Sequence, residues 1–508
     1  MAAGKPEHEA KEIELKLTFD PADDGRIVAH PILEAAGAPN VRELISIYYD
    51  TADDVLRKAG VFLRVRATGD GYVQTIKTAR GAGEFLERDE WECSLPTHTP
   101  DLDAAADTAL EPLLTAELRA ALSPRFHTRF RRKAYQLDHE GAEIELAVDQ
   151  GEITAGIKAA PVCELELELK SGDRRALFSL AKALAEIVPL TLGVKTKAER
   201  GFELLDDGDH AFEKAQAVTV TPEMSCAQAF RTVARNCLRQ VIVNAPAMRD
   251  GRPEALHQMR VGLRRLRAAI TLFGDVVADR DREAVEDFLK WIGGELGPAR
   301  DLDVFAADIL EPQRAAHPDD PELEAVYRDV MERRAAAYAR AFEAGSSGRF
   351  RGALLDLGAW IEIGDWENNA RAEDPVTGYA AGKLSKLRRS IKKKAKDLRD
   401  LNAAERHKLR IRAKRLRYAT EFFAATFRGK KSAKRQSKSL AALQCLQDAL
   451  GTLNDIATRR ALLAADGEDR MDARLAAPGT GPDEEEKWIK EAECAYERFT
   501  DVKAFWKA

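Results

Sequence analysis

The sequence lacks an apolar run approaching the roughly 20 residues that a membrane-spanning helix needs. Its first nine residues also lack the apolar segment of a signal peptide. Six cysteines occur in 508 residues, and no two of them form a Cys-x-x-Cys pair. We therefore expect reduced thiols in a cytoplasmic protein that has no membrane partner.

Three motifs that often carry hydrolytic chemistry are also missing. There is no Gly-rich phosphate loop that ends in Lys-Ser or Lys-Thr, no Gly-x-Ser-x-Gly and no His-Glu-x-x-His. These absences disfavour a P-loop nucleotidase, a serine hydrolase of that type and a zinc protease. Any catalysis must therefore depend on other residues.

What the sequence contains divides into two parts. Residues 1–205 consist of short alternating segments separated by turns, with a few helical stretches. Residues 223–508 show apolar residues at helical spacing almost throughout. The pattern breaks at 206–222, which we interpret as a linker. The predicted fold class is an α+β domain followed by an all-α domain.

Carboxylates alternate with apolar residues in two segments of the first part. These segments are Glu12-Ile-Glu14-Leu-Lys16 and Glu164-Leu-Glu166-Leu-Glu168-Leu-Lys170. A strand sends alternate side chains to opposite faces, so each charged set shares one face. Glu is disfavoured in strands, and a row of like charges is repulsive unless cations lie among them.

Basic residues alternate in the same way between these two segments. They lie in Arg64-Val-Arg66, Thr75-Ile-Lys77 and Arg129-Phe-Arg131. Arg binds phosphate through a planar fork and Lys binds it as a point charge, so together they would suit a polyanion. For any single strand the simpler interpretation stays open, namely that the charged face is the wet side of an antiparallel sheet.

Charges of both signs on one face indicate a site for an anion and a metal together. Carboxylates repel phosphate strongly where water is scarce. A divalent cation removes this conflict, because Mg²⁺ and Mn²⁺ prefer oxygen ligands and often bridge carboxylates to substrate phosphates. The sequence therefore predicts Mg²⁺ or Mn²⁺ at a phosphoanhydride site, where the metal would polarise a phosphoryl oxygen or ready a water for attack.

The ordered set of motifs resembles the CYTH domain, the family of triphosphate tunnel metalloenzymes. Further members of the set are Tyr49-Asp50-Thr51, Glu87-Arg88-x-Glu90 and Gly193-Val-Lys195-Thr-Lys197-Ala-Glu-Arg200-Gly201. The resemblance spans about residues 8–205. It implies a closed antiparallel β-barrel of eight strands, whose charged faces line a tunnel.

The resemblance also implies roles for individual residues. Metal-binding or catalytic positions are Glu12, Glu14, Glu164, Glu166 and Glu168. Which glutamate of the second acidic strand binds metal stays open. Triphosphate-binding positions are Lys16, Arg64, Arg66, Lys77, Arg88, Arg129, Arg131, Lys195, Lys197 and Arg200.

The helical part repeats a basic stripe. The first stripe is His257, Arg260, Arg264 and Arg267, and the second is His407, Arg410, Lys414 and Arg417, at an offset of 150 residues. The element Leu296-Gly297-x-x-Arg300-Asp301 recurs as Leu450-Gly451-x-x-Asn454-Asp455, at an offset of 154 residues. Each stripe occupies one face of a helix. The near-equal offsets indicate that one helical-bundle unit is duplicated.

The charge of the helical part predicts an anionic partner. Residues 383–417 carry 16 Lys or Arg against 3 Asp or Glu. Such a density repels itself along a helix, although a solvated surface without a ligand is the simpler alternative. Nucleic acid would also supply phosphates, but the few aromatic side chains here disfavour base stacking.

About residues 220–505 resemble the CHAD domain, a helical module often fused behind CYTH domains. This resemblance implies two pseudo-symmetric bundles, whose stripes bind long-chain polyphosphate. The domain order resembles that of bacterial inorganic triphosphatases, so we expect metal-dependent hydrolysis of inorganic tripolyphosphate. The alternatives are an adenylate cyclase or thiamine triphosphatase on the same barrel, or a non-catalytic polyphosphate-binding protein. Retention of both acidic strands argues against the last.

Overall fold

The computed structural model describes residues 7–8, 12–69, 71–78, 87–206, 212–464 and 482–507. Backbone contacts divide the chain into two units. The first is Met1–Lys214 with Arg239–Ala255 and Gly345–Gly364, and the second is Ala215–Leu238 with Leu256–Ala344 and Asp365–Ala508. The chain therefore returns twice to the first unit. The domain limits at 205 and 223 remain predictions.

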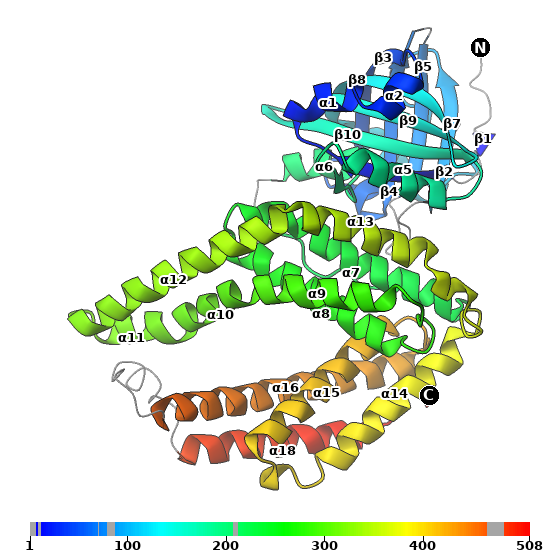
Figure 1. The fold of residues 1–508 in the computed structure, drawn as a ribbon. Coiled ribbons are helices and arrows are strands. Elements are labelled where there is room, and N and C mark those ends of the chain that lie inside the picture. The colour runs from blue at the N-terminus through cyan, green and yellow to red at the C-terminus, as the bar shows by residue number, and fades with distance from the viewer. Residues whose placement is uncertain are drawn as a thin grey trace. The chain divides into compact units, whose positions relative to one another are not determined.

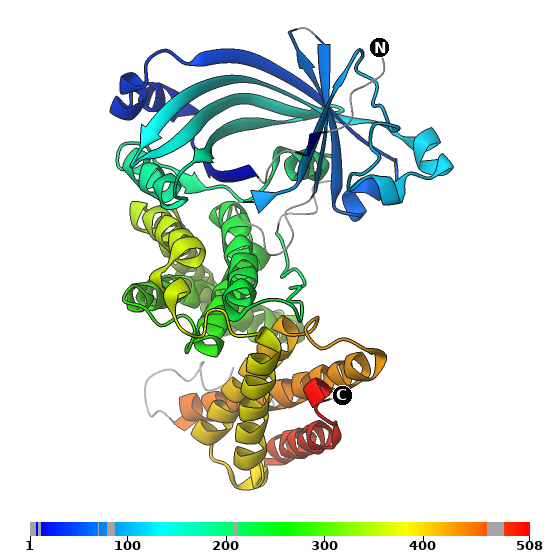
Figure 2. The same cartoon turned by 90° about the vertical axis from the view of Figure 1, so that its right-hand side faces the viewer.

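The first unit is built on an antiparallel sheet (Figure 1). Its strands are β1 (Glu7–His8), β2 (Glu12–Thr18), β3 (Asn40–Asp50), β4 (Val61–Thr68), β5 (Gly71–Thr78), β6 (Glu87–Arg88), β7 (Glu90–Leu95), β8 (Ser123–His139), β9 (Ala142–Ala155), β10 (Lys158–Ser171) and β11 (Thr191–Leu192). Neighbours follow the order β1-β7-β5-β4-β3-β8-β9-β10-β2-β11, and β6 pairs with β2. The long strands β8, β9 and β10 bend together, as the cyan ribbons of Figure 2 show.

Alternation along the strands separates an apolar face from a charged one. In β4, Val61, Leu63 and Val65 are buried in an apolar cluster with side chains from residues 102–122. Arg64 and Arg66 of the same strand line a cavity on the opposite face. The charged faces therefore line an interior, because successive side chains of a strand point to opposite sides.

The strands are more broken up than in the barrel of eight strands that the resemblance implied. Among the described residues the sheet has eleven strands, and β6 and β7 are separated by Asp89 alone. The outer edge of β2 is shared between two short partners, β6 at Glu12–Ile13 and β11 at Leu17–Thr18. No full-length strand therefore pairs with this edge among the described residues. The antiparallel sheet domain is confirmed, and the described residues form more strands than the eight expected.

Short helices connect the strands of the first unit. They are η1 (Pro21–Asp23), α1 (Asp24–Val28), α2 (Pro31–Ala35), α3 (Val55–Lys58), η2 (Glu111–Leu113), α4 (Ala116–Ala121), α5 (Arg175–Ala185) and α6 (Lys197–Leu205). Thr196 and Glu199 form a capping box at the start of α6. A Cβ atom at Gly201 would lie 2.1 Å from the Phe126 ring, so glycine lets α6 approach β8 closely. Phe126, Phe202 and Ala198 then pack into one apolar cluster.

The described residues that follow the sheet domain are mostly helical. Their helices are α7 (Cys226–Arg249), α8 (Pro253–Leu272), α9 (Arg282–Glu295), α10 (Gly297–Phe305), η3 (Ala306–Leu310), α11 (Glu311–Ala316), α12 (Pro321–Ser346), α13 (Gly348–Ile363), η4 (Asp365–Asn368), α14 (Val376–Lys394), η5 (Leu398–Asp400), α15 (Ala403–Phe422), α16 (Lys430–Ala464), α18 (Pro482–Asp501) and η6 (Phe505–Lys507). Figure 1 shows α14, α15, α16 and α18 gathered in one group. The predicted helical domain is confirmed.

The six cysteines are free thiols, as their scattered positions predicted. Among the helices that the structure describes, none is long and apolar enough to cross a membrane.

Candidate functional site

A cavity of about 200 Å³ lies on the charged face of the sheet. Seven basic side chains line it: Lys16, Arg64, Arg66, Lys77, Arg132, Lys170 and Lys197. Four carboxylates line it as well: Glu90, Glu92, Glu166 and Glu168. Positive charge is therefore in excess, which suits a polyanionic ligand.

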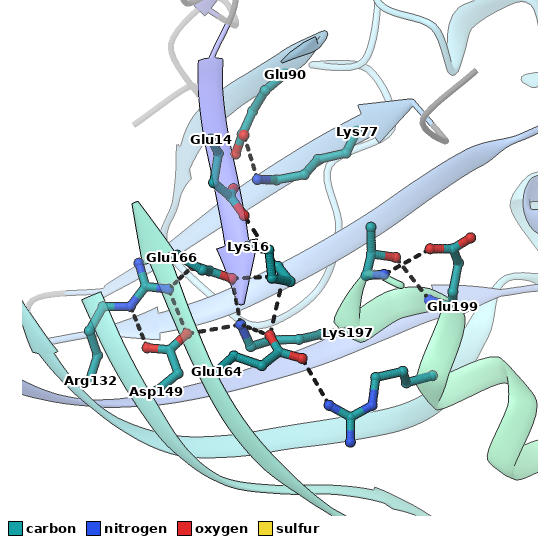
Figure 3. Close-up of polar contacts among 12 residues, drawn as sticks. Glu14, Lys16, Lys77, Glu90, Arg132, Asp149, Glu164, Glu166, Lys197 and Glu199 are labelled. Carbon is teal, nitrogen blue, oxygen red and sulfur yellow. Dashed lines mark hydrogen bonds and ion pairs between the residues drawn. The ribbon is translucent and has the colours of Figure 1, made fainter. Parts of the chain in front are cut away.

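Lys16 of β2 lies among carboxylates from both acidic strands (Figure 3). Its Nζ atom is 3.2 Å from Glu164, 2.9 Å from Glu166 and 3.8 Å from Glu14. The strand register explains the contact, because β2 and β10 are antiparallel and Lys16 is directly opposite Glu166. Lys16 is buried, so these carboxylates replace the water that its ammonium would otherwise hold.

Lys197, the first residue of α6, reaches the same carboxylates from the other side (Figure 3). Its Nζ atom is 2.8 Å from Asp149, 2.9 Å from Glu164 and 2.7 Å from Glu166. The capping box at Thr196 fixes the start of the helix and so directs Lys197 into the interior.

Two arginines complete this cluster. Arg132 of β8 donates two hydrogen bonds of 2.7 Å to Asp149 and also bonds Glu166. Arg200 of α6 donates a 2.8 Å hydrogen bond to Glu164. We call these eight residues the ion-pair cluster: the carboxylates Glu14, Asp149, Glu164 and Glu166, and the cations Lys16, Arg132, Lys197 and Arg200. Four negative charges thus face four positive ones.

The mutual contacts shift the pKa values of the cluster. Burial alone would raise the pKa of Glu164, but Lys16 and Lys197 lower it to about 2. Burial likewise opposes the charge of Glu166, yet Lys16, Lys197 and Arg132 hold its pKa well below the usual range. Burial would lower the pKa of Lys197, whereas Asp149, Glu164 and Glu166 raise it. Glu164, Glu166 and Lys197 are therefore charged at neutral pH.

The opposite wall of the cavity comes from β4, β5 and β7. Arg64 donates a 2.9 Å hydrogen bond to Thr75, which in turn donates one of 2.7 Å to Glu92. Lys77 forms an ion pair with Glu90. Burial, with the nearby charges of Arg64 and Arg132, lowers the pKa of Arg66 to about 9. A positive side chain that is buried beside two others is where an anion would be most stabilised.

Arg129 and Arg131 do not lie in this cavity. Both are exposed on the outer face of β8, where Arg129 pairs with Glu43 at 2.7 Å. The inner face of β8 presents Thr128, Phe130 and Arg132 instead. Arg132 was missed because basic residues from 131 to 133 occupy both faces of the strand, so alternation alone could not choose between them.

Other predicted phosphate ligands fall into three groups. Lys16, Arg64, Arg66, Lys77 and Lys197 line the cavity. Lys195 and Arg200 are not among the residues that line the cavity. Lys195 pairs with Glu203 at 2.6 Å, and Arg200 contacts Glu164 in the ion-pair cluster. The side chains of Glu12 and Arg88 lie outside the described residues, although their backbones pair β2 with β6.

The glutamates supply oxygen ligands of the kind that Mg²⁺ and Mn²⁺ prefer. Glu14 and Glu168 are directly opposite on β2 and β10, where Lys16 lies 3.8 Å from Glu14 and Lys170 lies 2.5 Å from Glu168. Within the described part of the chain, no three His, Cys, Asp or Glu side chains are grouped as a complete ligand set. Mg²⁺ commonly uses only one or two carboxylates together with substrate phosphates, so this pair fits such an ion.

The helical domain presents its two basic stripes on equivalent helices, α8 and α15. Arg260 lies against Gly297, where a Cβ atom would be 3.3 Å from its guanidinium. Arg410 lies against Gly451 in the same way, also at 3.3 Å. The repeated Leu-Gly element thus leaves room for one arginine in each half, a role that the spacing alone did not reveal.

The structure brings members of both stripes together around Lys414. Burial, Arg410, Arg264 and Arg417 all lower the pKa of Lys414, to about 8. Arg264 belongs to the first stripe and the other residues to the second. We call Arg260, Arg264, Arg410, Lys414 and Arg417 the basic cluster. His407 is bonded to Asn454 at 3.1 Å. Arg267 is exposed, and His257 is half-buried on the same helix.

Two family models match the chain, and their matched residues include the cavity of the sheet domain and the basic cluster of the helical domain. Residues 10–202 match the CYTH domain and residues 232–464 match the CHAD domain. An inorganic triphosphatase from Haemophilus influenzae is 30% identical over 201 residues, which are 38% of this chain and 55% of that protein. The chain therefore spans about half the length of this curated relative.

Two solved structures are also similar. The CHAD domain from the plant Ricinus communis is 29% identical, with a TM-score of 0.47, and the match covers 58% of this chain and 98% of that one. A candidate adenylyl cyclase from Hippeastrum, described as having a dominant triphosphatase activity, is 16% identical with a TM-score of 0.30. That match covers 38% of this chain and 95% of the other.

Proposed function

Since the chain contains a CYTH domain followed by a CHAD domain, we propose that it hydrolyses inorganic triphosphate in the cavity of the sheet domain, with Mg²⁺ or Mn²⁺. The observation that carries this proposal is the cavity itself, where seven basic side chains and four carboxylates of β7 and β10 share about 200 Å³. All of the lining residues fall within the matched CYTH domain.

The basic residues would bind the phosphates. Arg64 and Arg66 come from adjacent inward positions of β4, and Arg132 comes from β8. Their forks would hold the substrate in bidentate contacts and would stabilise charge that spreads over the phosphoryl oxygens during transfer. Lys197 lies at the N-terminus of α6, where the helix dipole adds to the attraction for an anion.

The carboxylates would hold the metal ion. Glu14 and Glu168 are directly opposite on β2 and β10, and Glu164 and Glu166 of β10 would become available when Lys16 and Lys197 turn to the phosphates. A bound divalent ion would polarise a phosphoryl oxygen. Glu90 forms an ion pair with Lys77, and its carboxylate would accept a proton from a water near the phosphates.

Substrate choice follows from what lines the cavity. Tyr48 and Phe62 are its aromatic residues, and both are buried in the apolar cluster with Phe126, on which Tyr48 stacks at 4.6 Å. Tyr72 packs on the outer face near His98, and Phe85 lies outside the described residues. No described aromatic side chain of the cavity is thus left to stack on a base.

We therefore expect tripolyphosphate to be preferred over ATP by about tenfold or more in kcat/KM, which is about 1.4 kcal/mol. A nucleoside would gain few contacts, and its polar groups would be buried without partners. Steady-state kinetics on both substrates at equal free Mg²⁺ measures the ratio. Equal values, or cyclic AMP as a product from ATP, would favour the cyclase instead.

The CHAD domain would bind long-chain polyphosphate through the basic cluster. Arg264 and Lys414 come from different repeats yet are close enough to interact, so one polyanion chain would contact both. Like charges held together in this way are relieved when an anion binds between them. The basic cluster is part of the matched CHAD domain.

Polyphosphate binding should weaken as the pH rises from 7 to 9. Burial and the neighbouring arginines lower the pKa of Lys414 to about 8, so the free side chain loses its proton in this range. A bound polyanion keeps Lys414 protonated, so binding takes up a proton and affinity falls by about tenfold. Titrations of long-chain polyphosphate at each pH measure the effect, and Lys414→Arg should flatten it. An unchanged slope in this variant would contradict the assignment.

A further inference from the structure

The ammonium groups of Lys16 and Lys197 lie where a metal ion would need to approach the carboxylates of β10. Lys197 is within 2.9 Å of both Glu164 and Glu166, and Lys16 is within 3.2 Å of both. Glu164 is 1% exposed, so water offers it little alternative solvation. In the free protein the two lysines therefore form ion pairs with the carboxylate oxygens of Glu164 and Glu166.

We infer that Lys16 and Lys197 keep divalent metal out of the site until triphosphate arrives, so that metal and triphosphate bind together rather than metal first. The inference rests on the proposed function, because it concerns the same cavity. It assigns to the two lysines a role in the order of binding, in addition to contact with phosphate.

The charge balance of the ion-pair cluster supports this order. Its four carboxylates already face four cations, so a divalent ion alone would leave two positive charges uncompensated. Such repulsion is strong where water is scarce. If the metal displaced a lysine instead, that ammonium would be buried without a partner, which is strongly unfavourable.

Triphosphate removes both obstacles. It brings several negative charges into the cavity, and the flexible side chains of Lys16 and Lys197 line that cavity and can turn to its oxygens. Glu164 and Glu166 then lose two cationic partners and can accept a metal ion. Binding of the metal and binding of triphosphate must strengthen each other by the same factor, since linkage is reciprocal.

Mn²⁺ binding to the full chain tests this without measuring turnover. The loss of the free Mn²⁺ signal in electron paramagnetic resonance would be titrated with Mn²⁺ alone and with Mn²⁺ plus the non-hydrolysable imidotriphosphate. We expect Mn²⁺ to bind about 100-fold more tightly with the analogue. This is the upper end of the change in metal affinity that the partners of metal ligands usually cause. Equal Mn²⁺ affinity with and without the analogue would overturn the inference.

Two lysine variants provide a matched comparison. Lys197→Met should let Mn²⁺ bind without the analogue, whereas Lys195→Met should not, because Lys195 forms its ion pair with Glu203. Lys16→Met is a second test if Lys197→Met fails to fold by circular dichroism. If neither folded variant binds Mn²⁺ better than Lys195→Met does, the lysines do not exclude metal.

Failure of the inference can be told from failure of the proposed function. A protein that binds free Mn²⁺ tightly and still hydrolyses tripolyphosphate would overturn only the binding order. A protein that shows the expected Mn²⁺ pattern without hydrolysing tripolyphosphate would overturn the enzyme assignment and leave the binding order standing.

Discussion

Replacing Glu14 by Gln should lower the rate of tripolyphosphate hydrolysis at least about 100-fold, or about 2.7 kcal/mol of barrier. Glu14 is buried, faces Glu168 across the strand pair and lies 3.8 Å from Lys16. The substitution keeps the shape of the side chain and removes a charged oxygen ligand, so the charge stabilisation that a metal supplies is lost. Phosphate release at saturating Mg²⁺ measures the effect.

Glu43→Gln is the matched control. Glu43 lies on the sheet too, but it is exposed on the outer face, where it pairs with Arg129. This variant should hydrolyse tripolyphosphate at the rate of the parent. If Glu14→Gln, shown to be folded by circular dichroism, keeps near-normal turnover, the metal assignment on β2 is wrong.

Replacing Arg260, Arg264, Arg410 and Lys414 by Ala should weaken binding of long-chain polyphosphate at least about 100-fold, because hydrogen bonds to charged groups contribute about 1.5–3 kcal/mol each. The slope of log affinity against log salt should also fall, by about 0.7 for each phosphate that the variant no longer binds. These residues are half-buried or exposed on α8 and α15, so their replacement should not unfold the domain. Binding isotherms at several salt concentrations measure both quantities.

The control for this variant removes the same number of charges elsewhere. Arg328, Arg333, Arg340 and Lys487 are exposed on α12 and α18. Their replacement by Ala should leave polyphosphate affinity within about twofold, because a distant surface charge is largely screened. An equal decrease in affinity in the two quadruple variants would mean that binding depends on total charge and not on the basic cluster.

The sequence predicted the charged faces well because strand alternation has a fixed period. Glu14 and Lys16, or Arg64 and Arg66, could be placed on a common face from spacing alone. The same rule failed at β8, where Arg131, Arg132 and Lys133 put positive charge on both faces. Only the register against β9, which sets Arg132 opposite Asp149, shows which arginine points inward.

The ion-pair cluster could not have been predicted from spacing. The repulsion within each acidic row correctly indicated that cations lie among the glutamates. In the structure these cations include Lys16 and Lys197, and Lys16 is separated from Glu164 by 148 positions of sequence. A contact of this kind depends on which strands become neighbours, and that is decided by the whole sheet.

The duplication in the helical half was visible in the sequence, whereas its packing was not. Equal offsets pointed to two equivalent stripes, and the structure places Arg260 and Arg410 against equivalent glycines. Nothing in the spacing indicated that Arg264 of one stripe would lie near Lys414 of the other. That proximity arises from tertiary packing between helices far apart in the chain.

The most direct test of this account is phosphate release from tripolyphosphate by the full chain, with Mg²⁺ or Mn²⁺ and with excess EDTA. We expect orthophosphate and pyrophosphate as products, formed only when metal is present. ATP and thiamine triphosphate under the same conditions should be poorer substrates. A folded protein that releases no phosphate with either metal, or releases it equally in EDTA, would contradict the assignment of a metal-dependent triphosphatase.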